Sequence, residues 1–148
     1  GACFAKGVSK DDQTVLPATK AFAGELNDAA GGNCGHLLPD PARGSACKRL
    51  HLMLRWLVRC DDVDPGGWQG VGTEKLVVPL DTHMHRISRQ LGLTKRKAAD
   101  GRTALEVTAA FRVIAPADPV RYDFALTRSG IRDDVPPVGE ARTNEHGT

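Results

Sequence analysis

The sequence has no apolar run of about 18 residues, the length that a membrane-spanning helix requires, and its first residues, GACFAKGVSK, lack the apolar stretch of a signal peptide. It also lacks a strong charge of one sign, because 20 Lys and Arg against 18 Asp and Glu leave a formal net charge of +2. Charge over the whole chain therefore does not indicate a nucleic-acid-binding protein, and any such surface has to be local. We expect no membrane association and, by default, a cytoplasmic location.

Cysteine is scarce, and its spacing excludes two further classes. The four cysteines are widely separated and have no secretory context, so free thiols are expected rather than a disulfide framework. We also expect no iron–sulfur cluster. On a helix, His83 and His85 point about 160° apart and cannot chelate one ion together. The sequence predicts no metal and no cofactor, and it leaves the oligomeric state open.

What is present suits one helical domain. The chain has 148 residues, of which 41% are hydrophobic, enough to build a core without staples. Apolar residues recur at helical spacing in four segments. They are residues 45–60, 81–91, 103–116 and 118–130. A shorter helix that Pro17 can open is expected near residues 17–30. The sequence predicts an all-α fold, with a poorly defined segment at 1–44, a helical core at 45–131 and a flexible tail at 132–148.

Capping signals set the expected ends of three helices. Asp81 stands directly after the apolar run KLVVPL as an N-cap, and Gly92 stands where a C′ glycine would end the same helix. The pair Thr103 and Glu106 forms a capping box for the next helix. Asp118, followed by a proline, is the expected N-cap of the last one.

Residues 43–59 form a local basic stretch without any acidic residue. Leu50, Leu54 and Val58 recur on one face of the helix predicted here, and the cations fall on the opposite face. That basic face holds Lys48, Arg55 and Arg59, together with His51. It is either a solvated helix face or a surface for phosphates, and the sequence leaves both interpretations open.

The strings GSACKRL, LRWLVR, PLDTHMHRISR and PVRYDFAL together resemble a bacterial family known only as a conserved domain of unknown function, over about residues 35–131. Within them, PLDTHMHRISRQLGL is similar to the catalytic segment of the helix-hairpin-helix DNA glycosylase superfamily, whose endonuclease III branch has a Val-Asp-Thr-His run. The resemblance implies a helical DNA-glycosylase-like fold. Because few residues precede the hairpin, we expect a partial fold in an N-terminally incomplete chain.

The same resemblance implies the site residues. The aspartate of this run is catalytic in the superfamily, which assigns Asp81. A Gly-x-Gly-x-Lys hairpin carries the lysine of its bifunctional members, and GSACK matches it with Gly44 and Lys48, although Ala46 replaces the second glycine. Lys48 and Asp81 are therefore the predicted catalytic residues. The predicted nucleic-acid-binding residues are Gly44, Ser45, Arg49, Arg55, Arg59, His83, Arg86 and Arg89.

The implied activity is base excision on a flipped-out nucleotide in DNA, by an N-glycosylase, an abasic-site lyase or both. Two alternatives stay open: a non-catalytic helix-hairpin-helix module that only binds DNA, and an inactive fragment. Lys48 is accordingly either a nucleophile or a contact to phosphate. Trp56 is expected in the core, and the place of Trp68, in a loop, is open.

Overall fold

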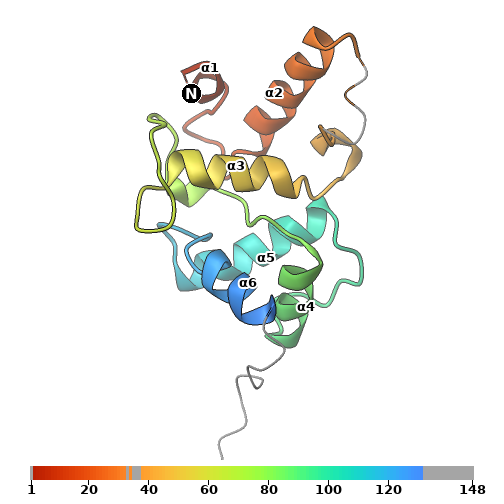
Figure 1. The fold of residues 1–148 in the computed structure, drawn as a ribbon, viewed down its shortest axis with the longest axis vertical. Coiled ribbons are helices and arrows are strands. Elements are labelled where there is room, and N and C mark those ends of the chain that lie inside the picture. The colour runs from red at the N-terminus through yellow and green to blue at the C-terminus, as the bar shows by residue number, and fades with distance from the viewer. Residues whose placement is uncertain (1, 33, 35–37, 132–148) are drawn as a thin grey trace, which may run out of the picture.

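The computed structural model describes residues 2–32, 34 and 38–131, and this part of the chain is helical, with no β-strand. Along these described residues, six α-helices and two short 3-10 helices follow one another (Figure 1). Their bounds are α1 (Ala2–Lys6), α2 (Leu16–Ala29), η2 (Pro41–Arg43), α3 (Lys48–Val58), η3 (Thr73–Lys75), α4 (Thr82–Gln90), α5 (Gly101–Ile114) and α6 (Asp123–Ile131). The predicted all-α class is confirmed. The expected tail at 132–148 lies outside the described residues.

Helix α3 crosses the middle of the molecule, with α1 and α2 on one side and α4, α5 and α6 on the other (Figure 1). Its Leu54 and Val58 belong to a core that also takes Met84 of α4 and Val107 of α5. Phe4, Val15 and Ala18 of the N-terminal segment join the same core. The first two helices are therefore packed on the domain that carries the predicted site, and Pro17 stands at the start of α2 as expected.

The apolar run before Asp81 is an extended segment inside the protein. Residues 76–80 are all buried, and they are not paired with another strand in the described part of the chain. The backbone amide of Val78 instead donates a hydrogen bond of 3.0 Å to the Thr108 hydroxyl, which satisfies a polar group that burial would otherwise leave unpaired. Packing on all sides thus fixes the position of the residue that follows, Asp81.

Both predicted ends of α4 are confirmed. Asp81 is the N-cap, and its Oδ1 accepts a hydrogen bond of 2.7 Å from the backbone N–H of Met84. Gly92 follows the helix with φ +73°, and the amide of Leu93 donates to the Ser88 carbonyl at 2.8 Å. These features form a Schellman motif, in which glycine supplies the left-handed residue without steric cost.

The predicted starts of the last two helices were wrong. Helix α5 begins at Gly101 with Asp100 as its N-cap, because the Asp100 carboxylate accepts the Thr103 amide at 2.9 Å while Thr103 is itself buried. Helix α6 begins at Asp123, after turns. Asp118 does not cap α6, since its Oδ2 accepts a hydrogen bond of 2.9 Å from Arg59 Nε.

Candidate active site

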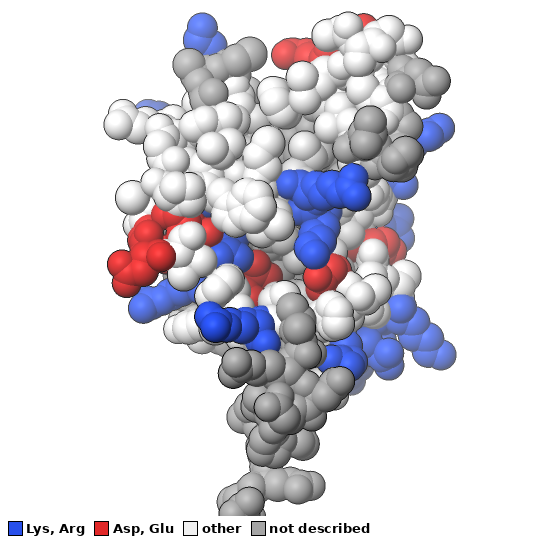
Figure 2. All heavy atoms as spheres, in the orientation of Figure 1, with Lys and Arg blue, Asp and Glu red and all other residues white. Residues whose placement is uncertain are grey.

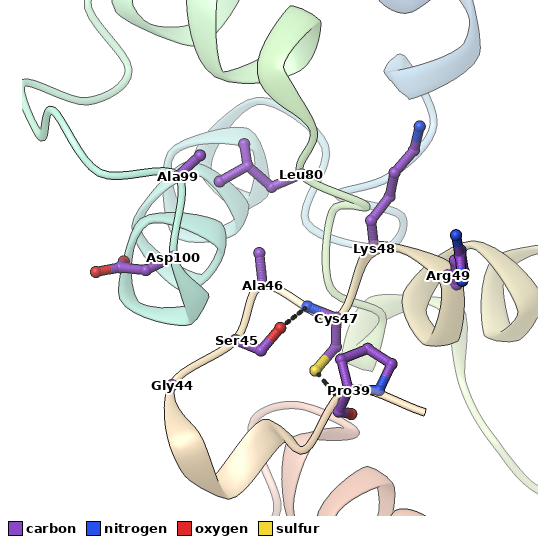
Figure 3. Close-up of a pocket in the computed structure, with 10 residues that line it drawn as sticks. All are labelled: Pro39, Gly44, Ser45, Ala46, Cys47, Lys48, Arg49, Leu80, Ala99 and Asp100. Carbon is purple, nitrogen blue, oxygen red and sulfur yellow. Dashed lines mark hydrogen bonds between the residues drawn. The ribbon is translucent and has the colours of Figure 1, made fainter. Parts of the chain in front are cut away.

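The loop from Gly44 to Cys47 joins η2 to α3 at the place of the predicted hairpin, and the candidate site is built on it (Figure 3). Gly44 has φ +81° and Cys47 φ +44°, so the chain turns twice through left-handed conformations. The Ser45 hydroxyl accepts the Cys47 amide at 3.2 Å, and the Cys47 thiol donates to the Pro39 carbonyl at 3.4 Å. Burial raises the pKa of this thiol. The hairpin therefore holds the first residue of α3, Lys48, in a defined place.

A cavity of about 390 Å³ lies between the hairpin and the residues that precede α4 and α5. Figure 3 shows Leu80 and Ala99 across this cavity from the hairpin, whereas the side chain of Lys48 extends away from it. The Gly44 carbonyl accepts a hydrogen bond of 2.8 Å from the Gly101 amide. A Cβ atom at Gly101 would come within 2.9 Å of the Ser45 carbonyl oxygen, so this close approach requires glycine.

Lys48 and Asp81 meet across 33 positions of sequence. Lys48 Nζ donates a hydrogen bond of 2.8 Å to Asp81 Oδ2, while Oδ1 of the same carboxylate caps α4. The Lys48 side chain is 45% exposed and that of Asp81 16%. Partial burial raises the pKa of Asp81, but the bonds from Lys48 and the Met84 amide outweigh this effect and lower the pKa. The pair thus presents an ammonium group and an ionised carboxylate at the surface.

A second cavity, of about 300 Å³, opens beside this pair between α3 and α6. Trp56 and Phe124 line it and stay 46% and 43% exposed. The prediction that Trp56 packs in the core was wrong; Trp68 is the tryptophan that packs there, with its ring centroid 5.7 Å from that of Phe4. The cavity combines a charged pair at its edge with two aromatic walls, a combination that suits a flat ring carrying polar groups.

Arg55 and Arg59 are not on an exposed basic face, which corrects that expectation. Both are buried, with exposures of 3% and 6%. Arg55 donates from Nε to Asp64 at 3.0 Å and from Nη1 to Asp123, and Arg59 donates from Nη1 to Asp64. Arg59 also pairs with Asp61 and Asp118. A buried guanidinium needs such partners, so these two arginines are neutralised inside the protein and offer no cation to a phosphate.

The profile of a family described as "Protein of unknown function (DUF2400)" matches residues 1–132. The chain belongs to this family. The predicted membership in a family of unknown function is thereby confirmed, and every residue of the candidate site in this DUF2400 chain lies inside the matched range. Neither a curated protein nor a solved structure matches the chain.

Four predicted nucleic-acid contacts of the DUF2400 chain are exposed at the surface. Arg49 follows Lys48 on α3, while His83, Arg86 and Arg89 lie on α4, the helix that Asp81 caps. On the face in Figure 2, basic side chains occupy separate places with acidic side chains between them. A continuous basic band is therefore not seen on this face. Whether the exposed residues bind DNA stays a prediction, as it does for Gly44 and Ser45 in the hairpin.

The sequence analysis missed Asp123 and Phe124, which line the cavity from the start of α6. Burial raises the pKa of the Asp123 carboxyl, although its contact with Arg55 works in the opposite direction. A signal for these residues existed, because PVRYDFAL is one of the strings on which the family resemblance rests. The sequence predicts Asp118 as the cap of this helix, whereas the helix begins at Asp123, so the local capping pattern indicates the wrong aspartate.

Among the described residues, no three His, Cys, Asp or Glu side chains come together as a metal site would require. Cys34, Cys47 and Cys60 are free thiols. Within the same part of the chain, no helix has the length and apolar character needed to cross a bilayer.

Proposed function

We propose that this chain performs base excision on DNA, as an N-glycosylase, an abasic-site lyase or both, with Lys48 and Asp81 as its catalytic residues. The observation that carries the proposal is the contact of 2.8 Å between Lys48 Nζ and Asp81 Oδ2, at the edge of the cavity between α3 and α6. An amine and a carboxylate fixed together beside an aromatic-walled cavity are the groups that such a reaction needs. The resemblance to helix-hairpin-helix glycosylases supports the same assignment.

In the proposed reaction the base leaves C1′ of a flipped-out deoxyribose, and positive charge builds on the sugar ring. The Asp81 carboxylate stabilises this charge because two hydrogen bonds already hold it in place and ionised. The Lys48 side chain first gives a proton to water, and its amine bonds to C1′ as the C1′–N bond breaks; the base leaves with the electron pair of that bond and takes a proton from water. Transfer of an amine proton to the ring oxygen then opens the sugar ring and gives a Schiff base. Loss of the C2′ proton then breaks the C3′–O3′ bond, and hydrolysis of the Schiff base restores the lysine.

The proposed DNA contacts surround this pair. Arg49 follows Lys48 on the exposed side of α3, and His83, Arg86 and Arg89 line the exposed side of α4. These residues would contact phosphates on either side of the flipped nucleotide, and Gly44 and Ser45 would approach one phosphate through the hairpin backbone. The proposed setting is the bacterial cytoplasm, where such DNA is found.

Borohydride trapping on a duplex with one abasic site tests the proposal. The wild-type chain should form a covalent adduct, and Lys48→Ala should form none, whereas Lys6→Ala, which removes an exposed lysine of α1, should trap normally. Asp81→Asn should bind the duplex as well as the wild type but trap far more slowly, because asparagine keeps the helix cap and loses the charge. Equal trapping by wild type and Lys48→Ala would exclude Lys48 as the nucleophile.

One observation favours the alternative of a module that binds DNA without cutting it. The Lys48 side chain is 45% exposed at the first residue of α3, so its charged end can reach a phosphate at the surface while it stays close to Asp81. That alternative predicts salt-sensitive binding of the duplex by the wild type, weaker binding by Lys48→Ala, and no adduct with either protein.

A further inference from the structure

The cavity between α3 and α6 has a polar floor that the proposed chemistry does not use. Asp123, the first residue of α6, lines it and is only 6% exposed, so its carboxylate is held in a site from which most water is excluded. Trp56 and Phe124 form the apolar walls. A flat ring stacked on these aromatic side chains would bring its edge against the carboxylate.

Asp123 is fixed in one orientation. Its Oδ2 accepts a hydrogen bond from Arg55 Nη1, and Arg55 is held in turn by Asp64 through Nε at 3.0 Å. The Arg55 guanidinium also lies 6.0 Å from the centroid of the Phe124 ring, so the floor and one wall of the cavity are in contact. The carboxylate cannot turn to suit a different ligand without giving up its pairing.

The second oxygen of Asp123 is available to a ligand. Among the described residues, none donates a hydrogen bond to Oδ1. Burial raises the pKa of this carboxyl, while the hydrogen bond from Arg55 and the N-terminal end of the helix favour its ionised form. The ionised form accepts hydrogen bonds but donates none. A ring that offers an N–H group to Oδ1 gains a charge-assisted bond, whereas a ring that offers a carbonyl oxygen or a methyl group leaves a buried acceptor unpaired.

We propose that Asp123 is a specificity-determining residue, which selects nucleobases that direct an exocyclic amino group into the cavity floor. The substrate class is thereby narrowed to bases of the adenine, cytosine or guanine type and their damaged derivatives that keep the amino group. This inference rests on the base-excision function proposed above. It concerns which base is accepted, and it assigns Asp123 no part in bond breaking.

The first test is a matched pair of nucleosides that needs no variant. 2′-Deoxyadenosine and 6-methylpurine 2′-deoxyriboside have nearly the same shape, but a methyl group replaces the amino group in the second. In an amide NMR titration of the wild-type chain, followed at Phe124 and at the Trp56 indole, the amino compound should bind at least about tenfold more tightly. 2′-Deoxycytidine and 2′-deoxyguanosine are titrated in the same way, with thymidine for comparison. Equal binding of amino and non-amino compounds, or no binding of any, overturns the proposal.

Variants then assign the preference to a residue. Asp123→Asn keeps the shape of the side chain but adds a donor, and it should bring the two affinities within about twofold of each other. Thr127→Val removes the hydroxyl that also lines this cavity, and it should leave the preference unchanged. If Asp123→Asn does not fold, Thr127→Val still tests the assignment. Loss of the preference would assign it to the Thr127 hydroxyl, and retention would assign it to the Asp123 carboxylate. Loss of the preference in Thr127→Val, or its survival in a folded Asp123→Asn, overturns the assignment to Asp123.

The proposed function and this inference fail in different ways. An abasic site has no base to select, so the wild-type chain should form the borohydride adduct whether or not it discriminates between the nucleosides, if Lys48 and Asp81 are catalytic. Formation of the adduct without discrimination between the nucleosides would overturn the proposed role of Asp123 and would still support base excision. Discrimination that depends on Asp123, without any trapping, would keep the base pocket and remove the lyase mechanism.

Discussion

The basic face predicted for α3 has one cation at the surface, at the N-terminal end of the helix, and two inside the protein, toward its C-terminal end. Lys48 shares a single carboxylate and is 45% exposed, whereas Arg55 and Arg59 are buried among four aspartates. In the sequence all three belong to one basic face. The difference shows that equal spacing along a helix does not give equal environments, because the loop after α3 and the start of α6 cover only one end of it.

The largest loss of stability should come from removing an arginine from the buried network at the C-terminal end of α3. Arg55→Met leaves Asp123 without its arginine and Asp64 with only one, so the free energy of unfolding should fall by about 3–5 kcal/mol. Urea denaturation measures this loss. Arg49→Met, which changes an exposed arginine on the same helix, should alter it by no more than about 0.5 kcal/mol. A loss below about 1 kcal/mol for Arg55→Met would show that the buried network is not a structural requirement.

His51 lies on the same face and provides a second way to separate surface from interior. Burial lowers its pKa from 6.5 to about 4, and its Nδ1 has no hydrogen-bond partner in the described structure. The folded protein therefore keeps His51 neutral while the unfolded chain takes up a proton below pH 6.5. Stability should fall as the pH drops from 6.5 to about 4, by about 3 kcal/mol from this residue, and then level off.

The variant His51→Leu should remove this slope, which denaturation midpoints at pH 7 and pH 5 would reveal. The wild type should lose stability between these two pH values, and the variant should lose clearly less. A variant with the same pH dependence as the wild type would show that His51 stays accessible to protons in the folded state.

At the exposed end of α3, the two contributions of Asp81 to stability, its helix cap and its charge, can be measured separately. Asp81→Ala removes the cap of α4 and should cost about 1 kcal/mol, whereas Asp81→Asn keeps an acceptor for the Met84 amide and should cost less. Because the pKa of Asp81 is lowered on folding, its charge stabilises the protein above the unfolded value of 3.8 and ceases to do so as the pH falls through the folded value. Equal losses in both variants would mean that the charge, rather than the cap, stabilises the fold.

The smallest effect is expected for Lys48. Lys48→Met breaks an ion pair whose lysine is largely in contact with solvent, so the free energy of unfolding should change by less than about 1 kcal/mol, and by less still in high salt. Denaturation in low and high salt measures both changes. A loss as large as that of Arg55→Met would remove the contrast between the two ends of α3.

Much of the fold could be predicted because the signals are local. The periodicity of α3, the cap and the C′ glycine of α4, and the proline of α2 each depend on neighbouring residues, and all agree with the structure. The starts of α5 and α6 could not be predicted in the same way. Thr103 and Asp118 both look like caps in the sequence, but Thr103 is buried inside α5 and a distant partner, Arg59, engages Asp118. Where a contact with a distant residue decides the end of a helix, the neighbouring sequence cannot predict that end.

The candidate site also has one part that could be predicted from local sequence and one part that could not. Lys48 and Asp81 were singled out from short strings, and the structure brings their side chains into contact, while their catalytic role remains a prediction. The sequence did not indicate Asp123 and Phe124, because they are candidate site residues only through a cavity whose walls come from α3 and α6. The N-terminal segment gave weak signals too, yet Phe4 and Val15 are in the core, since a short helix needs only a few apolar residues to pack.

The close approach of Gly101 to the hairpin has a consequence for the order of events during folding. The Gly44 carbonyl receives its hydrogen bond from a residue far along the chain, so local interactions alone cannot complete the hairpin. The intervening chain has to close into a loop before this bond forms, and such long-range closure is the slow part of assembling a helical domain. A nascent chain that had not yet reached α5 would possess the lysine and the aspartate without the contact that completes the hairpin.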